Sequence, residues 1–150
     1  GAPPGGAAVA DCSDQSWKDF EQHLTAAQSA FTRGNAKPIQ ALWSHAKDVS
    51  IFGAAGGHEI GWDLVGPRLA WAATLKPAGV YSDQRLTLVM QKPLALVVQI
   101  EQVTRPNADG TRAETNRLRV THVARCEGTA WRLIHRHADR LTETIPAKPR

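Results

Sequence analysis

The chain has 150 residues, of which 42% are hydrophobic, a formal net charge of +4 and a pI near 9.4. This length suits one domain, and the apolar fraction is large enough for a core, which excludes an intrinsically disordered chain. The sequence has no Lys/Arg block, glycine-rich phosphate loop or apolar run of about 20 residues. We therefore expect no nucleic-acid partner and no membrane span, whereas the mild positive charge fits an acidic small ligand.

The chain begins with GAPPGGAAVAD, a Gly/Pro/Ala tract that directly precedes Cys12. Such a tract has little reason to fold and resembles the linker behind a cleaved export signal. We predict a flexible arm over residues 1–12, a folded domain over 13–140 and a tail over 141–150, in a periplasmic or secreted protein. Cys12 and Cys126 are then either bridged, tying the arm to the domain, or two unrelated free thiols.

Three helices are predicted in the first half of the chain. The first lies within residues 13–34, begins at Ser13 or Ser16 and ends at Gly34. Its apolar residues follow helical spacing, namely Trp17, Phe20, Leu24, Ala27 and Phe31. A short helix follows within 35–45, and a third runs from 62 to about 76.

Strands dominate the second half of the chain. A short strand over 49–52 is followed by a predicted loop at Gly53, Gly56 and Gly57. Four longer strands follow, within residues 82–91, 94–105, 115–128 and 131–139. This order predicts an α+β domain in which three N-terminal helices pack on a curved, mostly antiparallel sheet.

The last predicted strand, WRLIHRHAD, carries two of the six histidines. Strand alternation places Trp131, Leu133, His135 and His137 on one face. His122 alternates with apolar residues of the preceding strand and also points toward an apolar face. These three histidines could form a zinc site, but such a site needs three convergent ligands and a second shell, and we expect neither metal nor cofactor.

The segments FTRGNAKPIQALWSHAKDVSIFGAAGGHEIGW and LRVTHVARCEGTAWRLIHRHAD, together with the helix order, resemble the nuclear transport factor 2-like superfamily. The resemblance is to its SnoaL-like branch, especially the association domain of calcium/calmodulin-dependent kinase. It implies a cone-shaped α+β barrel of cystatin-like fold, with a pocket between helices and sheet and a homodimer through the outer sheet face. In the kinase association domain an arginine matches His122, inside a pocket that accepts small carboxylates.

On this resemblance we expect a binding domain for a small, partly apolar ligand that can carry a carboxylate. The expected lining residues are Trp43, Trp62, Trp71, Tyr81, His122, His135 and His137. The alternative is a dehydratase or isomerase that uses His122 or His135 as general base. The aspartate base of ketosteroid isomerases would fall on Gly53, which argues against that route. A third interpretation is an assembly module with a vestigial pocket.

Overall fold

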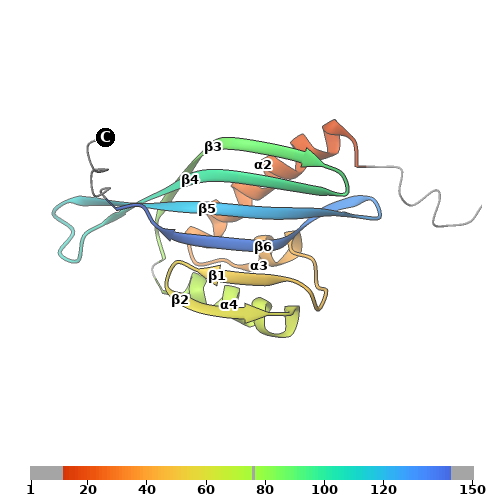
Figure 1. The fold of residues 1–150 in the computed structure, drawn as a ribbon. Helices are drawn as coiled ribbons and strands as arrows, with labels where there is room; N and C mark the ends of the chain where they lie inside the picture. Colours follow the sequence, from red (N-terminus) through yellow and green to blue (C-terminus); the bar gives the residue numbers. More distant parts are fainter. Residues whose placement is uncertain (1–11, 76, 143–150) are drawn as a thin grey trace, which may run out of the picture.

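The computed structural model describes residues 12–75 and 77–142, so most of the predicted arm and tail lies outside the described residues. It confirms the α+β architecture with a curved, six-stranded sheet (Figure 1). None of the described helices is long and apolar enough to cross a membrane. The helices are α2 (Asp14–Thr32), α3 (Lys37–Leu42) and α4 (Trp62–Ala73), and the strands are β1 (Ser50–Gly53), β2 (Gly56–Ile60), β3 (Val80–Gln91), β4 (Leu94–Pro106), β5 (Ala113–Glu127) and β6 (Ala130–Arg140).

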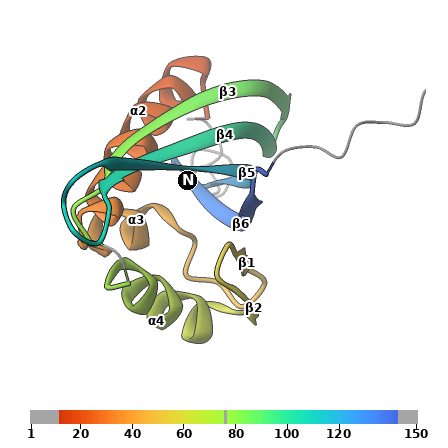
Figure 2. The same ribbon diagram turned by 90° about the vertical axis from the view of Figure 1, so that its left-hand side faces the viewer.

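The strands lie in the order β2-β1-β6-β5-β4-β3, and every neighbouring pair is antiparallel except β1 and β6. The three helices lie on the concave side of the curved sheet (Figure 2). Helix α2 begins where the sequence predicts, because the Ser13 side chain accepts a hydrogen bond from the Ser16 backbone N–H. Its apolar face is buried in the core, and the buried residues include Trp17, Phe20, Leu24 and Ala27. The predicted apolar stripe is thus the stripe that closes the concave face.

The glycine segment after β1 is not a loop, as predicted, but a hairpin. Strand β2 pairs with β1, with Ser50 opposite Ile60 and Ile51 opposite Glu59. Gly56 and Gly57 have φ angles of 96° and 78°, a left-handed conformation that glycine adopts without steric cost. The glycines therefore let the chain reverse tightly and add an edge strand to the sheet.

A β-bulge in β6 overturns the predicted common face of Trp131, Leu133, His135 and His137. Ala124 of β5 lies opposite Leu133, but the preceding Val123 lies opposite His135, so Ile134 is an extra residue in β6. An extra residue inverts the alternation of everything beyond it. Trp131 and Leu133 are consequently buried in the core, whereas His135 and His137 lie on the outer face.

Of the two alternatives left open for Cys12 and Cys126, the structure has the disulfide. Their Cα atoms lie 6.1 Å apart, and the bond joins residues separated by 114 positions in the sequence. It ties the segment just before α2 to the end of β5. A cross-link over so long a stretch strongly restricts the unfolded chain, so we expect it to stabilise the fold.

Replacing both cysteines, Cys12→Ser with Cys126→Ser, should lower the free energy of unfolding by roughly 2–4 kcal/mol in urea denaturation. A second experiment tests the bridge directly: thiol titration of the denatured wild-type protein without reductant should detect no free thiol. Two titratable thiols in that experiment, or unchanged stability of the double variant, would show that the bridge does not form.

Candidate functional site

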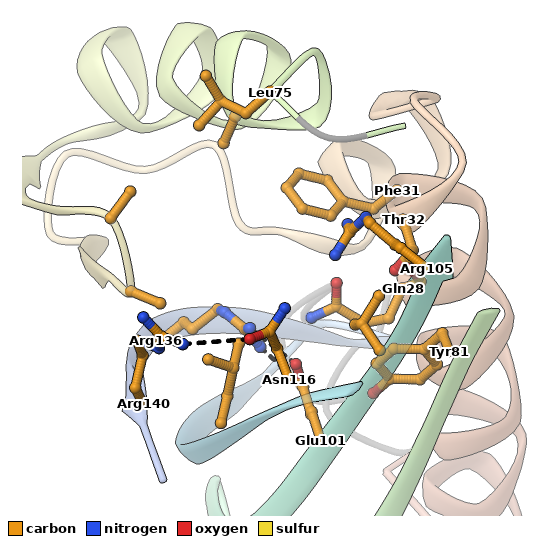
Figure 3. Close-up of a pocket in the computed structure, with 15 residues that line it drawn as sticks. Gln28, Phe31, Thr32, Leu75, Tyr81, Glu101, Arg105, Asn116, Arg136 and Arg140 are labelled. Atoms are coloured by element: carbon orange, nitrogen blue, oxygen red, sulfur yellow. Dashed lines mark hydrogen bonds and ion pairs between the residues drawn. The ribbon is translucent and has the colours of Figure 1, made fainter. Parts of the chain in front are cut away.

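A cavity of about 300 Å³, open to solvent on one side, lies between the helices and the inner sheet face (Figure 3). Part of its wall is apolar. This part comes from α2, from α4 and the segment just after it, and from the sheet, and it includes Phe31, Ala72, Leu75, Val103 and Leu118. The polar and charged side chains form another part of the wall. Its charged members are Glu101, Arg105, Arg136 and Arg140.

Strand alternation explains why these charged side chains face inward. Glu101 on β4 lies opposite Leu118 on β5, and His122 on β5 lies opposite Arg136 on β6. Residues opposite one another in a sheet point to the same face. The bulge in β6 decides which residue of that strand enters the interior, because it turns His135 outward and Arg136 inward.

Glu101 and Arg136 form a buried, two-point ion pair at the floor of the cavity. Both terminal nitrogens of Arg136 donate to the Glu101 carboxylate at 2.8 Å, and Gln99 Nε2 donates to the same carboxylate at 2.8 Å. Glu101 is only 2% exposed. Burial by itself would raise the pKa of Glu101, but the Arg136 charge and these hydrogen bonds outweigh it and lower the pKa to about 2. Glu101 is therefore ionised at neutral pH.

His122 lies behind this ion pair and is 1% exposed. Arg136 Nη1 approaches His122 Nε2 at 3.0 Å. A guanidinium can only donate, so Nε2 accepts and the neutral ring carries its proton on Nδ1. Nδ1 has no hydrogen-bond partner among the described residues. Burial, followed by the Arg136 charge, lowers the pKa of His122 to about 3, so the ring is neutral at physiological pH.

Arg136 keeps two of its five N–H donors free of hydrogen bonds to the described residues. Nη1 donates to Glu101 and His122 and Nη2 donates once to Glu101, which leaves the second Nη2 hydrogen and Nε–H without an acceptor among the described residues. Arg136 lines the cavity, and two further arginines, Arg105 and Arg140, lie in the same wall. Asn116 Oδ1 accepts from Arg140 at 3.2 Å, which orients the Arg140 side chain. The charged side chains of the described wall are thus three guanidinium groups and one carboxylate.

The structure brings two of the predicted lining residues to a cavity wall and holds a third behind it. Tyr81 lines the main cavity, with its hydroxyl donating to Asp83 at 2.8 Å, and Trp43 lines an adjoining chamber. Burial, with the charges of Glu101 and Asp83, raises the pKa of Tyr81, so this hydroxyl stays protonated. His122 is buried behind Arg136 and is not part of the wall.

Four predicted lining residues lie elsewhere. The Trp62 ring stacks on the His45 ring, with the two ring centroids 3.9 Å apart. Trp71 is 48% exposed, and the Arg68 guanidinium lies over its ring. The bulge places His135 and His137 on the outer face, where both contact Phe52 edge-on and His135 Nδ1 lies 2.8 Å from Ser50 Oγ. Within the described residues, no three His, Cys, Asp or Glu side chains are grouped to hold a metal.

The residues that sequence reasoning missed are Arg136, Arg105 and Arg140. Arg136 is adjacent to His135 in the sequence, and only the bulge distinguishes their faces. A usable signal existed on β4, where Gln99, Glu101 and Arg105 interrupt the apolar alternating face begun by Ala95 and Val97. Buried charges need a partner, so an inward Glu101 implies an inward cation.

Comparisons with known proteins agree with this architecture. A family model described as a SnoaL-like domain matches residues 20–139. A solved structure of a proposed calcium/calmodulin-dependent protein kinase type II association domain from Thiobacillus denitrificans is 18% identical, with a TM-score of 0.70 over 83% of this chain and 94% of that chain. The search of curated proteins found no match.

Two further solved structures align with 87% of this chain over their own full length. One is a proposed dehydratase of the nuclear transport factor 2-like family from Streptomyces avermitilis, at 18% identity and a TM-score of 0.69. The other is a ketosteroid isomerase-like protein from Erwinia carotovora atroseptica, at 14% identity and a TM-score of 0.66. At these identities the comparison establishes a common fold and leaves the chemistry to the side chains.

The variant His122→Gln should flatten the pH dependence of stability below neutrality. The unfolded chain protonates this histidine near pH 6.5, whereas the folded chain resists protonation until about pH 3. The wild-type free energy of unfolding should thus fall as the pH drops through this window, by up to about 1.4 kcal/mol per pH unit for one proton. The slope should be correspondingly smaller in the variant, measured by urea denaturation between these limits.

The same replacement at exposed His58 is the matched control and should leave the slope unchanged. Superimposable pH profiles for the wild type and His122→Gln would contradict the placement of a buried, neutral imidazole behind Arg136.

Proposed function

The chain belongs to the SnoaL-like domain family, whose model spans residues 20–139, and we propose that it binds a small, partly apolar carboxylate in its interior cavity. The observation that carries the proposal is the arrangement of Arg136. Glu101 fixes its terminal nitrogens from one side, and its Nε donates to no described residue. Arginine forms charge-assisted hydrogen bonds with carboxylates in a defined planar geometry, so a pre-oriented guanidinium with a spare donor suits such a ligand.

The charge balance of the wall supports an anionic ligand. Glu101 pairs with Arg136, and Arg140, which donates to the neutral Asn116 side chain, adds a further positive charge to the same wall. Charges of one sign gathered in a low-dielectric cleft raise the local concentration of the opposite ion. Phe31, Leu75 and Leu118 supply apolar surface for the rest of the molecule, as is usual for small-molecule pockets.

The protonation states favour binding over the alternative of a dehydratase or isomerase with a histidine base. A general base is most effective when its pKa is close to the working pH. His122 has a pKa near 3 and its Nε2 already accepts from Arg136, while His135 lies on the outer face. Glu101, at a pKa of about 2, is an equally weak base. The described wall therefore supports recognition of a ligand better than proton transfer.

We further propose that the protein is exported and forms a homodimer through its outer sheet face. The disulfide supports an oxidising compartment, such as the periplasm or the extracellular space. Val89 and Leu94 are large apolar side chains exposed on the outer face of β3 and β4, where a second copy would cover them. Solved neighbours described as association domains share this fold.

Benzoate should bind to the wild-type protein in isothermal titration calorimetry, and the neutral analogue benzamide should bind at least about tenfold more weakly. Arg136→Gln should abolish the preference for the charged ligand, because it removes the oriented guanidinium. That change leaves Glu101 buried without its partner and can unfold the protein. Arg140→Gln at the exposed rim is therefore the second variant, and we expect it to weaken benzoate binding several-fold.

Arg119→Gln is the matched control, since Arg119 pairs with Asp139 on the outer face and should not affect binding. Equal affinities for benzoate and benzamide, or no binding of either up to about 10 mM, would refute the proposal.

A further inference from the structure

A second, smaller chamber adjoins the main cavity and shares part of its wall. It has a volume of about 120 Å³, and Phe31, Leu118 and Arg136 line both spaces. The walls that belong to the inner chamber alone come from α3 and the segment after it, β1 and α4. They include Ile39, Trp43, Ile51 and Leu69.

The two spaces differ in chemistry. The four side chains that characterise the inner chamber are almost fully buried, and their one polar atom is Trp43 Nε1, which has no hydrogen-bond partner among the described residues. Of the described residues that line it, Arg136 alone carries a charge, and Arg136 also belongs to the main cavity. Glu101, Arg105 and Arg140 line the main cavity but not the inner chamber. The charge is thus confined to one end of the combined space, and Arg136 marks the boundary.

This asymmetry restricts how an amphipathic ligand can lie. A carboxylate placed in the inner chamber would lose its hydration among Ile39, Ile51 and Leu69, which is costly for an ionised group. An apolar group placed there is removed from water against apolar walls, which is favourable in proportion to its area. The opposite arrangement would leave the apolar end of the ligand against Arg105 and Arg140.

We propose that the ligand is a monocarboxylate with an extended apolar tail, whose carboxylate lies beside Arg136 in the main cavity and whose tail fills the inner chamber between Trp43 and Leu69. This inference rests on the proposed binding of a carboxylate and adds its orientation and tail. Tail length is then the determinant of specificity: very short carboxylates satisfy Arg136 but leave the inner chamber unfilled. Dicarboxylates are selected against, because a second charge would enter the apolar chamber.

The test is the affinity of the full chain for acetate, butyrate, hexanoate and octanoate, measured by calorimetry. Each added methylene should strengthen binding by about three- to fourfold until the inner chamber is full. Adipate, a dicarboxylate with the same number of carbons as hexanoate, should bind more weakly than hexanoate. Pentylammonium has the same alkyl tail as hexanoate and should also bind more weakly, since its ammonium group would lie beside the Arg136 guanidinium.

Leu69→Phe narrows the inner chamber and should remove the gain from tail length. Leu64→Phe, at an exposed position of the same helix outside both spaces, is the matched control and should preserve that gain. The ligand series tests the orientation of the ligand on the wild-type protein alone, so the test still holds if Leu69→Phe does not fold.

The outcomes separate the two proposals. Affinity for carboxylates that does not depend on tail length would overturn the orientation and leave carboxylate binding standing. A gain from tail length that persists in folded Leu69→Phe would also overturn it, because the tail would then lie elsewhere. Adipate that binds as tightly as hexanoate contradicts the apolar character of the inner site. Binding of no carboxylate in the series refutes the proposed function itself, and this inference with it.

Discussion

The ion pair between Glu101 and Arg136 is the interaction on which the character of the cavity depends. It is buried and doubly hydrogen-bonded, and it holds Glu101 ionised and His122 neutral. A buried ion pair is weak evidence for stability, since the cost of removing two charges from water offsets much of their attraction. Its stronger consequence is geometric, because it fixes the guanidinium in one orientation. A pre-oriented donor loses little freedom when a ligand binds, which favours recognition.

A single extra residue in β6 creates this arrangement. Without the bulge at Ile134, alternation would direct His135 into the interior and Arg136 to the outer face. Strand β6 pairs with β1 on one side and with β5 on the other. In both pairings Arg136 lies beside a buried residue, Ile51 of β1 and His122 of β5. Bulges are common next to functional sites for this reason: they redirect a side chain without altering the rest of the sheet.

These features also show what the sequence can and cannot reveal. The α2 stripe was predictable because its apolar spacing persists over several turns, and Ser13 and Gly34 mark its two ends. The bulge was not, because WRLIHRHAD contains no glycine or proline to signal it and its register depends on distant strands. A site predicted from the alternation of one strand was therefore displaced by one residue, from His135 to Arg136. Tyr81 and Trp43 were found at cavity walls because their placement did not depend on that register.

In the binding mode proposed above, Arg136 receives a carboxylate at the boundary between a charged cavity and an apolar chamber. The most direct test is a crystal structure of the protein with 4-iodobenzoate, in which anomalous scattering locates the iodine independently. We expect iodine in the inner chamber beside Trp43 and Leu69, with a carboxylate oxygen about 2.7–2.9 Å from Arg136 Nε and the pair with Glu101 intact. Iodine in the main cavity, a carboxylate bound away from Arg136, or a ligand held only on the outer sheet face would contradict it.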